Sequence, residues 1–183
     1  MRSSGFGRWL ALGRRVNGIT SGVDSAVRTV GVISDTHGLL RQEALDALDG
    51  SDFIIHAGDI GDATVVKRLR ALAPVTVVRG NIDKGHWAFD IPQTEVLEVD
   101  GTLFYVLHIV EQLDLDPRVA GFHVVVSGHS HRPQIEKRDG VVFLNPGSAG
   151  PRRFKLPVSV ARVQVGGGVI QAEIVELAVG SKS

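Results

Sequence analysis

The fold is decided by residues 29–38, which read TVGVISDTHG. A short apolar run rich in β-branched residues ends here in a polar loop, which indicates a strand buried on both faces of a sheet. Two similar units follow at residues 52–59 (DFIIHAGD) and 75–81 (VTVVRGN), and a segment with helical spacing precedes each of them. This alternation predicts a parallel sheet with right-handed crossover connections.

The separating segments are predicted to be amphipathic helices. Residues 41–50 read RQEALDALDG and end in a glycine suited to a C-cap. Residues 63–73 read ATVVKRLRALA and are followed by Pro74, which cannot continue a helix. Apolar residues recur at helical spacing in both segments, at Ala44, Leu45, Leu48, Val65, Val66, Leu69 and Leu72.

The second half of the chain is built from hairpins. Residues 94–108 and 135–145 each contain two strand-like runs joined by Asp-Gly, a favoured two-residue hairpin turn. Residues 158–177 form a similar pair around three glycines, and residues 116–121 (DPRVAG) are predicted to form a short helix. The expected fold class is therefore α/β (α+β), with two mixed β-sheets packed face to face and flanking helices outside.

Composition narrows the possible functions. Net charge is zero over 183 residues, so no electrostatic field is built to hold extended nucleic acid or an anionic membrane. The absence of cysteine excludes disulfides, thiolate metal sites and cysteine nucleophiles, and fits a reducing compartment. No apolar run approaches the ~20 residues that a membrane span needs. We therefore expect a cytoplasmic protein without a membrane partner.

Residues 1–27 differ in composition from the rest of the chain. They contain four arginines against a single acid, Asp24. Their longest apolar piece, residues 9–12, is too short for the apolar region of a secretory signal. We interpret residues 1–27 as a poorly ordered N-terminal extension or the product of an upstream start codon, with a targeting segment as the alternative. Residues 28–178 are expected to form the single domain, followed by a C-terminal tail at 179–183.

Polar side chains follow five of the strand-like runs, at the point where each run ends. In open α/β sheets, ligands bind beyond the carboxyl ends of the strands. Each motif alone is ordinary turn sequence, and the strongest single one is SGHSHRP at residues 127–133. Together they predict that the following residues meet at one edge: Asp35, His37, Asp59, Asn81, His108, His129 and His131.

This set of side chains indicates a metal site. Histidine, carboxylate and amide oxygen without thiolate suit Mn²⁺, Fe²⁺, Zn²⁺ or Ni²⁺. Seven protein ligands are too many for one catalytic ion with an open position, and they suit two ions that share a bridging carboxylate. We therefore expect two divalent metal ions, with Mn²⁺ first and Ni²⁺, Zn²⁺, Fe²⁺ or Mg²⁺ as alternatives.

Five motifs in this order, ISDTHG, HAGDIGD, VRGNID, SGHSHRP and LNPGSAGPR, resemble those of the calcineurin-like metallophosphoesterases. The likeness is closest to their small bacterial and archaeal phosphodiesterase branch and runs from about Thr29 to Leu177. It implies a four-layer αββα sandwich. It also implies one ion held by Asp35, His37, Asp59 and His131, and another held by Asp59, Asn81, His108 and His129, with Asp59 as the bridge.

The resemblance implies hydrolysis of a small phosphodiester, or of another phosphate ester, by a hydroxide that bridges the two ions and attacks phosphorus in line. We assign parts in catalysis to Asp59, Asn81 and His108. Asp83 is expected to position the substrate or to orient a ligand or loop.

Two positions depart from the family pattern. Ile109 follows His108 where the family usually carries Gly, and because a β-branched residue does not readily adopt positive φ, this loop is predicted to run differently. Ile82 follows Asn81 where some relatives carry a His that acts as general acid, so this role is vacant. We therefore expect diester hydrolysis with modest turnover, above monoester hydrolysis.

Three histidines lie outside the ligand set. His56 is interpreted either as support for the neighbouring ligands or as a buried histidine bonded to the backbone, and His86 and His123 as structural or surface residues. The rival function is a protein-interaction scaffold of the same fold with weak or no catalysis, which resembles the role of a eukaryotic relative in vesicle sorting. A nuclease would share the chemistry, but zero net charge argues against a long nucleic-acid track. The sequence leaves open whether the chain forms homo-oligomers.

Overall fold

The structure is a computed structural model and describes residues 26–180. The predictions for residues 1–25 and 181–183 lie outside this range. Within it, the chain forms two five-stranded sheets, each with parallel and antiparallel neighbours. The regular elements run from Arg28 to Glu176.

The first sheet contains β1 (Arg28–Ile33), β2 (Phe53–His56), β3 (Val75–Val77), β9 (Ser159–Gly166) and β10 (Val169–Glu176). Its strand order is β10-β9-β1-β2-β3. β1, β2 and β3 are parallel, as the alternation of strands and helices predicts. β9 joins β1 antiparallel and forms the predicted hairpin with β10, so the sheet is mixed.

The second sheet contains β4 (Thr94–Val99), β5 (Thr102–Leu107), β6 (Val124–Val126), β7 (Gln134–Arg138) and β8 (Val141–Asn145). Its strand order is β4-β5-β6-β8-β7, with β5, β6 and β8 parallel. Both predicted Asp-Gly hairpins form. Positive φ at both turn residues, 46° and 80° in one and 49° and 89° in the other, matches the turn type that the twist of a hairpin favours.

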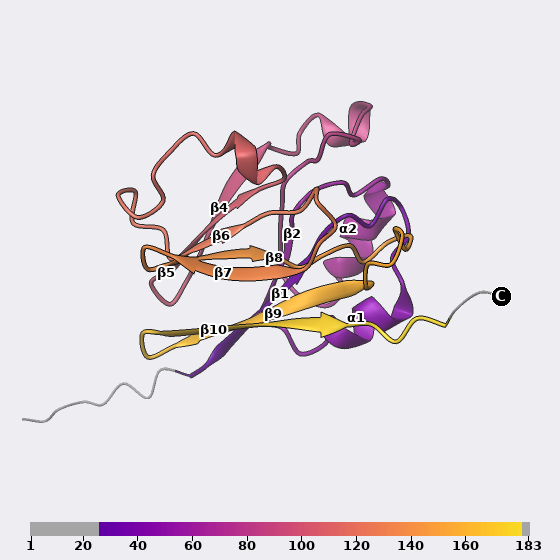
Figure 1. The fold of residues 1–183 in the computed structure, drawn as a ribbon. Helices are drawn as coiled ribbons and strands as arrows, with labels where there is room; N and C mark the ends of the chain where they lie inside the picture. Colours follow the sequence, from indigo (N-terminus) through magenta and orange to yellow (C-terminus); the bar gives the residue numbers. More distant parts are fainter. Residues whose placement is uncertain (1–25, 181–183) are drawn as a thin grey trace, which may run out of the picture.

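The main hydrophobic core lies between the two sheets. Val32 and Ile55 of the first sheet meet Phe104 and Val126 of the second in one buried cluster. A second cluster fills the other face of the first sheet, where α1 (Gln42–Leu48) and α2 (Ala63–Leu69) pack. Both helices therefore lie on the side of the first sheet away from the second, as Figure 1 shows.

The outer face of the second sheet is covered by a shorter element. η2 (Val110–Gln112), a 3-10 helix, leads into Leu113, which packs with Leu107 and Val125 on this face. The predicted αββα sandwich is thus confirmed, with a 3-10 turn in place of an α-helix in its fourth layer. None of the helices within residues 26–180 is long and apolar enough to cross a membrane.

Two helix predictions need correction. The second predicted helix ends at Leu69 and is followed by a hydrogen-bonded turn, in which Leu72 is 39% exposed. Residues 116–121 form a single turn, which the Asp116 side chain caps at its start and Gly121 ends with a φ of 83°. A segment closed at both ends in this way is too short for a helix.

Candidate metal centre

The seven candidate ligands meet at the carboxyl ends of five strands. Asp35 and His37 follow β1, Asp59 follows β2, Asn81 follows β3, His108 follows β5, and His129 and His131 follow β6. Side-chain contacts of 4.0 Å or less connect all seven into one cluster. The predicted convergence of residues distant in sequence is therefore present.

Asp35, His37 and His131 form the first half of the cluster. Asp35 Oδ1 lies 3.3 Å from His131 Nε2, which lies 3.4 Å from His37 Nε2. The two imidazoles are stacked with their centroids 5.2 Å apart. One ligand atom from each residue lies within 4.8 Å of the others, a spacing that lets one cation contact all three.

The second half is built around an amide oxygen. Asn81 Oδ1 lies 3.1 Å from His108 Nε2 and 3.1 Å from His129 Nδ1, so two imidazoles converge on it. His108 Nε2 also lies 3.2 Å from Asp59 Oδ1. Carboxylate, amide oxygen and imidazole are together the donor set of an intermediate or hard divalent cation.

Asp59 stands between these halves, and Asp35 of the first half also lies near the second. Asp59 Oδ2 lies 4.0 Å from His37 Nε2 in the first half, while its Oδ1 faces the second. Asp35 joins Asp59 and His108 in another set of ligand atoms that lie within 4.8 Å of one another. The geometry thus places Asp35 in both such sets, and the role of Asp59 as the bridge stays a prediction.

One carboxylate oxygen of the cluster is buried without a hydrogen-bond partner. Asp35 is fully buried, and its Oδ2 accepts hydrogen bonds from Ser34 Oγ at 2.7 Å and from the His129 N–H at 3.1 Å. Its Oδ1 has no hydrogen-bond partner within residues 26–180. Burial raises the pKa of Asp35 to about 6, because the ionised form is removed from water. A cation beside Oδ1 would give this oxygen a partner and would stabilise the ionised form of the buried carboxylate, so the site fits a bound metal ion.

The backbone around the cluster is strained. Five of the seven ligands adopt φ between 48° and 67°, a left-handed region that non-glycine residues rarely occupy: Asp35, His37, Asp59, His129 and His131. Such conformations cost on the order of 1–3 kcal/mol each and persist where the surrounding structure enforces them. A Cβ on Gly80 or Gly128 would collide with a ligand carboxylate, so the backbone also packs unusually closely here. Strain concentrated on polar residues in this way is typical of a functional site.

Asp83 holds two of the ligand loops together. Its carboxylate accepts hydrogen bonds from the N–H groups of Ile60, Gly61 and Gly80, at 3.1, 2.8 and 2.8 Å. Both oxygens are therefore used by the backbone of the loops that follow β2 and β3. Of the two roles predicted for Asp83, this geometry favours the orienting one.

Asn145 is a supporting residue for which the sequence predicted no role. Its Nδ2 donates to Gly128 O at 2.6 Å and to Ser130 Oγ at 3.1 Å, and its Oδ1 accepts from the Gly147 N–H at 2.9 Å. It therefore fixes the loop that follows β6 and carries two of the histidines. The available signal was its place in the motif LNPGSAGPR, directly at the end of a strand.

His108 is oriented by the backbone. Its Nδ1 lies 2.7 Å from Ala57 O, so the Nδ1–H donates to this carbonyl and Nε2 faces Asp59 and Asn81. Ile109 follows with φ −111° and ψ 108°. The loop therefore leaves His108 in an extended conformation, as the preference of a β-branched residue predicts.

The other three histidines lie away from the ligand atoms. His56 Nδ1 accepts from the Gly58 N–H at 3.3 Å, so its Nε2–H donates to Thr36 Oγ1 at 2.9 Å. His56 thus joins the loops after β1 and β2 and meets both descriptions offered for it, support and buried histidine. His86 and His123 are exposed, as predicted for surface residues.

His56 predicts a specific loss of stability in acid. It is fully buried, and burial lowers the pKa of His56 to about 3. In the unfolded chain the His56 imidazole binds a proton near pH 6.5, whereas in the folded chain it stays neutral there. The free energy of unfolding therefore has its full value above pH 6.5 and falls by about 1.4 kcal/mol per pH unit below it. Urea unfolding at pH 7 and pH 5 should therefore show a steeper loss for the wild type than for His56→Gln.

His86→Gln is the matched control for this measurement, because it removes an exposed histidine. It should keep the wild-type dependence on pH. Equal pH dependence for all three proteins would contradict a buried neutral His56.

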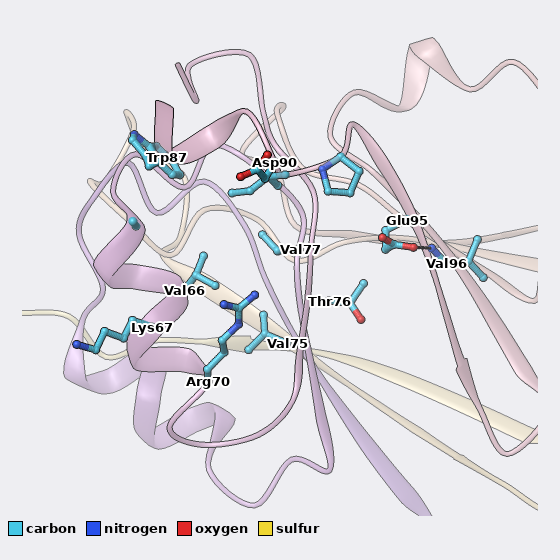
Figure 2. A pocket seen from close by; sticks show the side chains of 13 residues that line it. Val66, Lys67, Arg70, Val75, Thr76, Val77, Trp87, Asp90, Glu95 and Val96 are labelled. Atoms are coloured by element: carbon cyan, nitrogen blue, oxygen red, sulfur yellow. Dashed lines mark hydrogen bonds between the residues drawn. The ribbon is translucent and has the colours of Figure 1, made fainter. Parts of the chain in front are cut away.

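A large cavity lies away from the cluster. It measures about 610 Å³ and opens between α2 and β3 on one side and the segment from Trp87 to Val96 on the other (Figure 2). Arg70 points toward its centre and Lys67 away from it, and none of the candidate ligands lines it. A smaller cavity of about 290 Å³ lies directly over the cluster. Asn81 and His108 also line a neighbouring cavity of about 410 Å³, so the candidate ligands border these two spaces and not the first.

Comparison with known proteins agrees with the geometry. The family model of the calcineurin-like phosphoesterase superfamily domain matches residues 29–168. A probable metallophosphoesterase of Methanothermobacter thermautotrophicus is 32% identical over 158 residues, which cover 80% of this chain and 91% of that protein. A phosphodiesterase of Methanocaldococcus jannaschii is 28% identical over 136 residues, which cover 64% of this chain and 82% of that protein.

The fold is also shared with solved structures. Vacuolar protein sorting 29 from Cryptosporidium parvum superposes with a TM-score of 0.67 at 18% identity, over 82% of this chain and 98% of that one. At this identity the likeness concerns the fold alone, whereas the family match extends over most of the described chain. The chain belongs to the calcineurin-like phosphoesterase superfamily.

Proposed function

We propose that the protein is a phosphodiesterase that works with two divalent metal ions, Mn²⁺ first among them. The observation that carries the proposal is the buried Asp35 carboxylate, whose Oδ1 faces His131 Nε2 at 3.3 Å and has no hydrogen-bond partner within residues 26–180. Membership of the superfamily and the likeness to an archaeal phosphodiesterase support it.

The two halves of the cluster would each hold one ion. Asp35, His37 and His131 face one position, Asn81, His108 and His129 face the other, and Asp59 borders both. When bound, such a pair of ions supplies a water of lowered pKa that attacks phosphorus and positive charge beside the phosphoryl oxygens. The substrate class is then a small phosphate ester.

The chain's own contribution is to hold the ligands in place before substrate arrives. The Nδ1–H of His108 is bound to Ala57 O, which leaves Nε2 directed at the cluster. Asp83 and Asn145 tie the neighbouring loops to each other through backbone groups. A site fixed in this way needs little reorganisation during the reaction.

The position at which some relatives carry a general acid holds an apolar residue. Ile82 follows Asn81, its N–H donates to Asp59 Oδ1 at 3.1 Å, and its side chain lines the cavity over the cluster. The absence of a general acid has least effect on an ester whose leaving group departs without being protonated. We therefore propose diesters with good leaving groups as better substrates than monoesters.

Removal and return of metal test the proposal. Protein treated with a chelator should not hydrolyse bis(p-nitrophenyl) phosphate, and Mn²⁺ should restore the activity. With Mn²⁺ present, kcat/KM for this diester should exceed that for p-nitrophenyl phosphate by about tenfold or more. Metal content measured beforehand, and parallel assays with Ni²⁺, Zn²⁺ and Mg²⁺, identify the effective ion.

Either of two results would contradict the proposal. A monoesterase that ignores the diester would refute the order of substrates, and a folded protein that hydrolyses neither ester with any of these metals would favour the scaffold function.

A further inference from the structure

The loop formed by residues 148–158 is pinned beside the cluster. Ser148 Oγ donates to Asp35 O at 3.0 Å, and Ser148 also pairs with Val158 in an isolated β-bridge. The base of the loop is therefore closed and attached to the backbone of a candidate ligand. This attachment fixes where the tip of the loop can lie.

The tip of the loop faces the candidate ligands. Its residues Arg153, Phe154 and Leu156 line the same cavity of about 290 Å³ as His37, Asp59, Asn81, His129 and His131. A cavity of this size is at the lower end of the range for small-molecule sites, which suits a phosphate ester with a single ring.

Arg153 offers a free positive charge at this place. It is exposed, and its guanidinium makes no hydrogen bond or ion pair within residues 26–180. Because Arg153 lines the same cavity as His37 and His131, this charge lies beside the candidate ligands. A planar guanidinium binds phosphate oxygens through paired hydrogen bonds.

Phe154 is an outlier in two respects. It is 94% exposed, so it contributes almost nothing to the core, and its φ of 52° lies in the left-handed region. A strained, exposed aromatic residue at the mouth of a polar site has no explanation in the stability of the fold. Its open ring face is suited to stacking on a planar group of a ligand.

We propose that Arg153 binds a non-bridging oxygen of the substrate phosphate and that Phe154 stacks on an aromatic ring of the ester group. The protein then selects small phosphodiesters that carry an aryl or nucleobase-like ring. This inference rests on the proposed function and narrows its substrate class.

Two diesters with the same leaving group test the role of Phe154. Bis(p-nitrophenyl) phosphate and methyl p-nitrophenyl phosphate both release p-nitrophenolate, but only the first carries a second ring. The preference of the Mn²⁺-loaded wild type for the first, as a ratio of kcat/KM values, should exceed that of Phe154→Ala by about tenfold, and Phe154→Trp should keep the wild-type ratio. Phe89→Ala, which removes an aromatic residue that is 64% exposed and outside this cavity, should change nothing.

Arg153→Gln tests the phosphate contact. It should raise KM for both diesters equally, by about 10- to 100-fold, and weaken inhibition by inorganic phosphate to the same degree. Arg152→Gln is the matched control, because Arg152 precedes it in the same loop and does not line this cavity. Arg153→Lys should recover part of the loss.

Binding measured without turnover separates this inference from the proposed function. Calorimetry on the Mn²⁺-loaded protein should show phenyl phosphate binding about tenfold more tightly than methyl phosphate, with the difference absent in Phe154→Ala. If neither diester is hydrolysed but this difference is found, the proposed function fails and the binding inference stands. If diesters are hydrolysed but wild type, Phe154→Ala and Arg153→Gln have the same ring preference and KM, the inference is overturned.

Discussion

Asp59→Asn should reduce Mn²⁺-dependent hydrolysis of bis(p-nitrophenyl) phosphate by at least about a thousandfold while the protein stays folded. Asp59 is 3% exposed and borders both halves of the cluster, with Oδ1 at 3.2 Å from His108 Nε2 and Oδ2 at 4.0 Å from His37 Nε2. The substitution keeps the shape of the side chain but removes the negative charge that two cations would share. Metal content by mass spectrometry should fall together with activity.

The control for this substitution lies on the same loop. Asp62 is exposed and accepts the Thr64 N–H at the start of α2, a role that Asn fills equally well. Asp62→Asn should therefore keep full activity and metal content. Activity of Asp59→Asn within tenfold of the wild type would show that Asp59 does not hold the ions.

The arrangement of the sheets could be predicted because the sequence states it locally. Apolar runs alternate with helical spacing up to β3, and Asp-Gly marks two hairpins, so each step of the topology follows from a few adjacent residues. The ends of the helices were harder to predict from the sequence. α2 ends at Leu69, five residues before Pro74, and no residue type between them marks this end.

The identity of the candidate ligands could also be predicted, because each lies at the end of a strand. The residues that hold these ligands in place could not be predicted. Asp83 acts on three backbone N–H groups and Asn145 on a loop that follows a different strand, and such contacts depend on how loops fold back in space. The left-handed φ of Asp35 or His129 is likewise invisible in the sequence, since neither residue type requires it.

The same limit applies to the loop that carries Arg153 and Phe154. The motif LNPGSAGPR was recognisable, but it ends at Arg152, and the sequence assigned no role to the two residues that follow it. The closed base at Ser148 and Val158 and the cavity that the loop shares with the ligands show that it is held over the cluster. The role proposed for this loop therefore rests on the fold and not on the motif.

Asp35→Asn should have opposite effects on function and on stability. Asp35 is fully buried, and burial raises the pKa of its carboxyl group to about 6, whereas the unfolded chain ionises near pH 3.9. The unfolded state therefore binds fewer protons than the folded state between these values, and stability falls as pH rises from about 4 to about 6. Above pH 6 the full cost is present, on the order of 3 kcal/mol in the metal-free protein.

Asn at this position would keep an acceptor for Ser34 Oγ and the His129 N–H without any charge. The metal-free Asp35→Asn variant should thus melt roughly 6–12 °C above the wild type at pH 7, with no gain near pH 4. In Mn²⁺ the order should reverse, because the wild type alone gains stability from binding, and the variant should lose diester hydrolysis. Asp90→Asn, a change at an exposed carboxylate away from the cluster, should leave both quantities unchanged. A metal-free Asp35→Asn variant that melts below the wild type at pH 7 would mean that the buried carboxylate is satisfied without a cation, and the case for a metal at this site would fail with it.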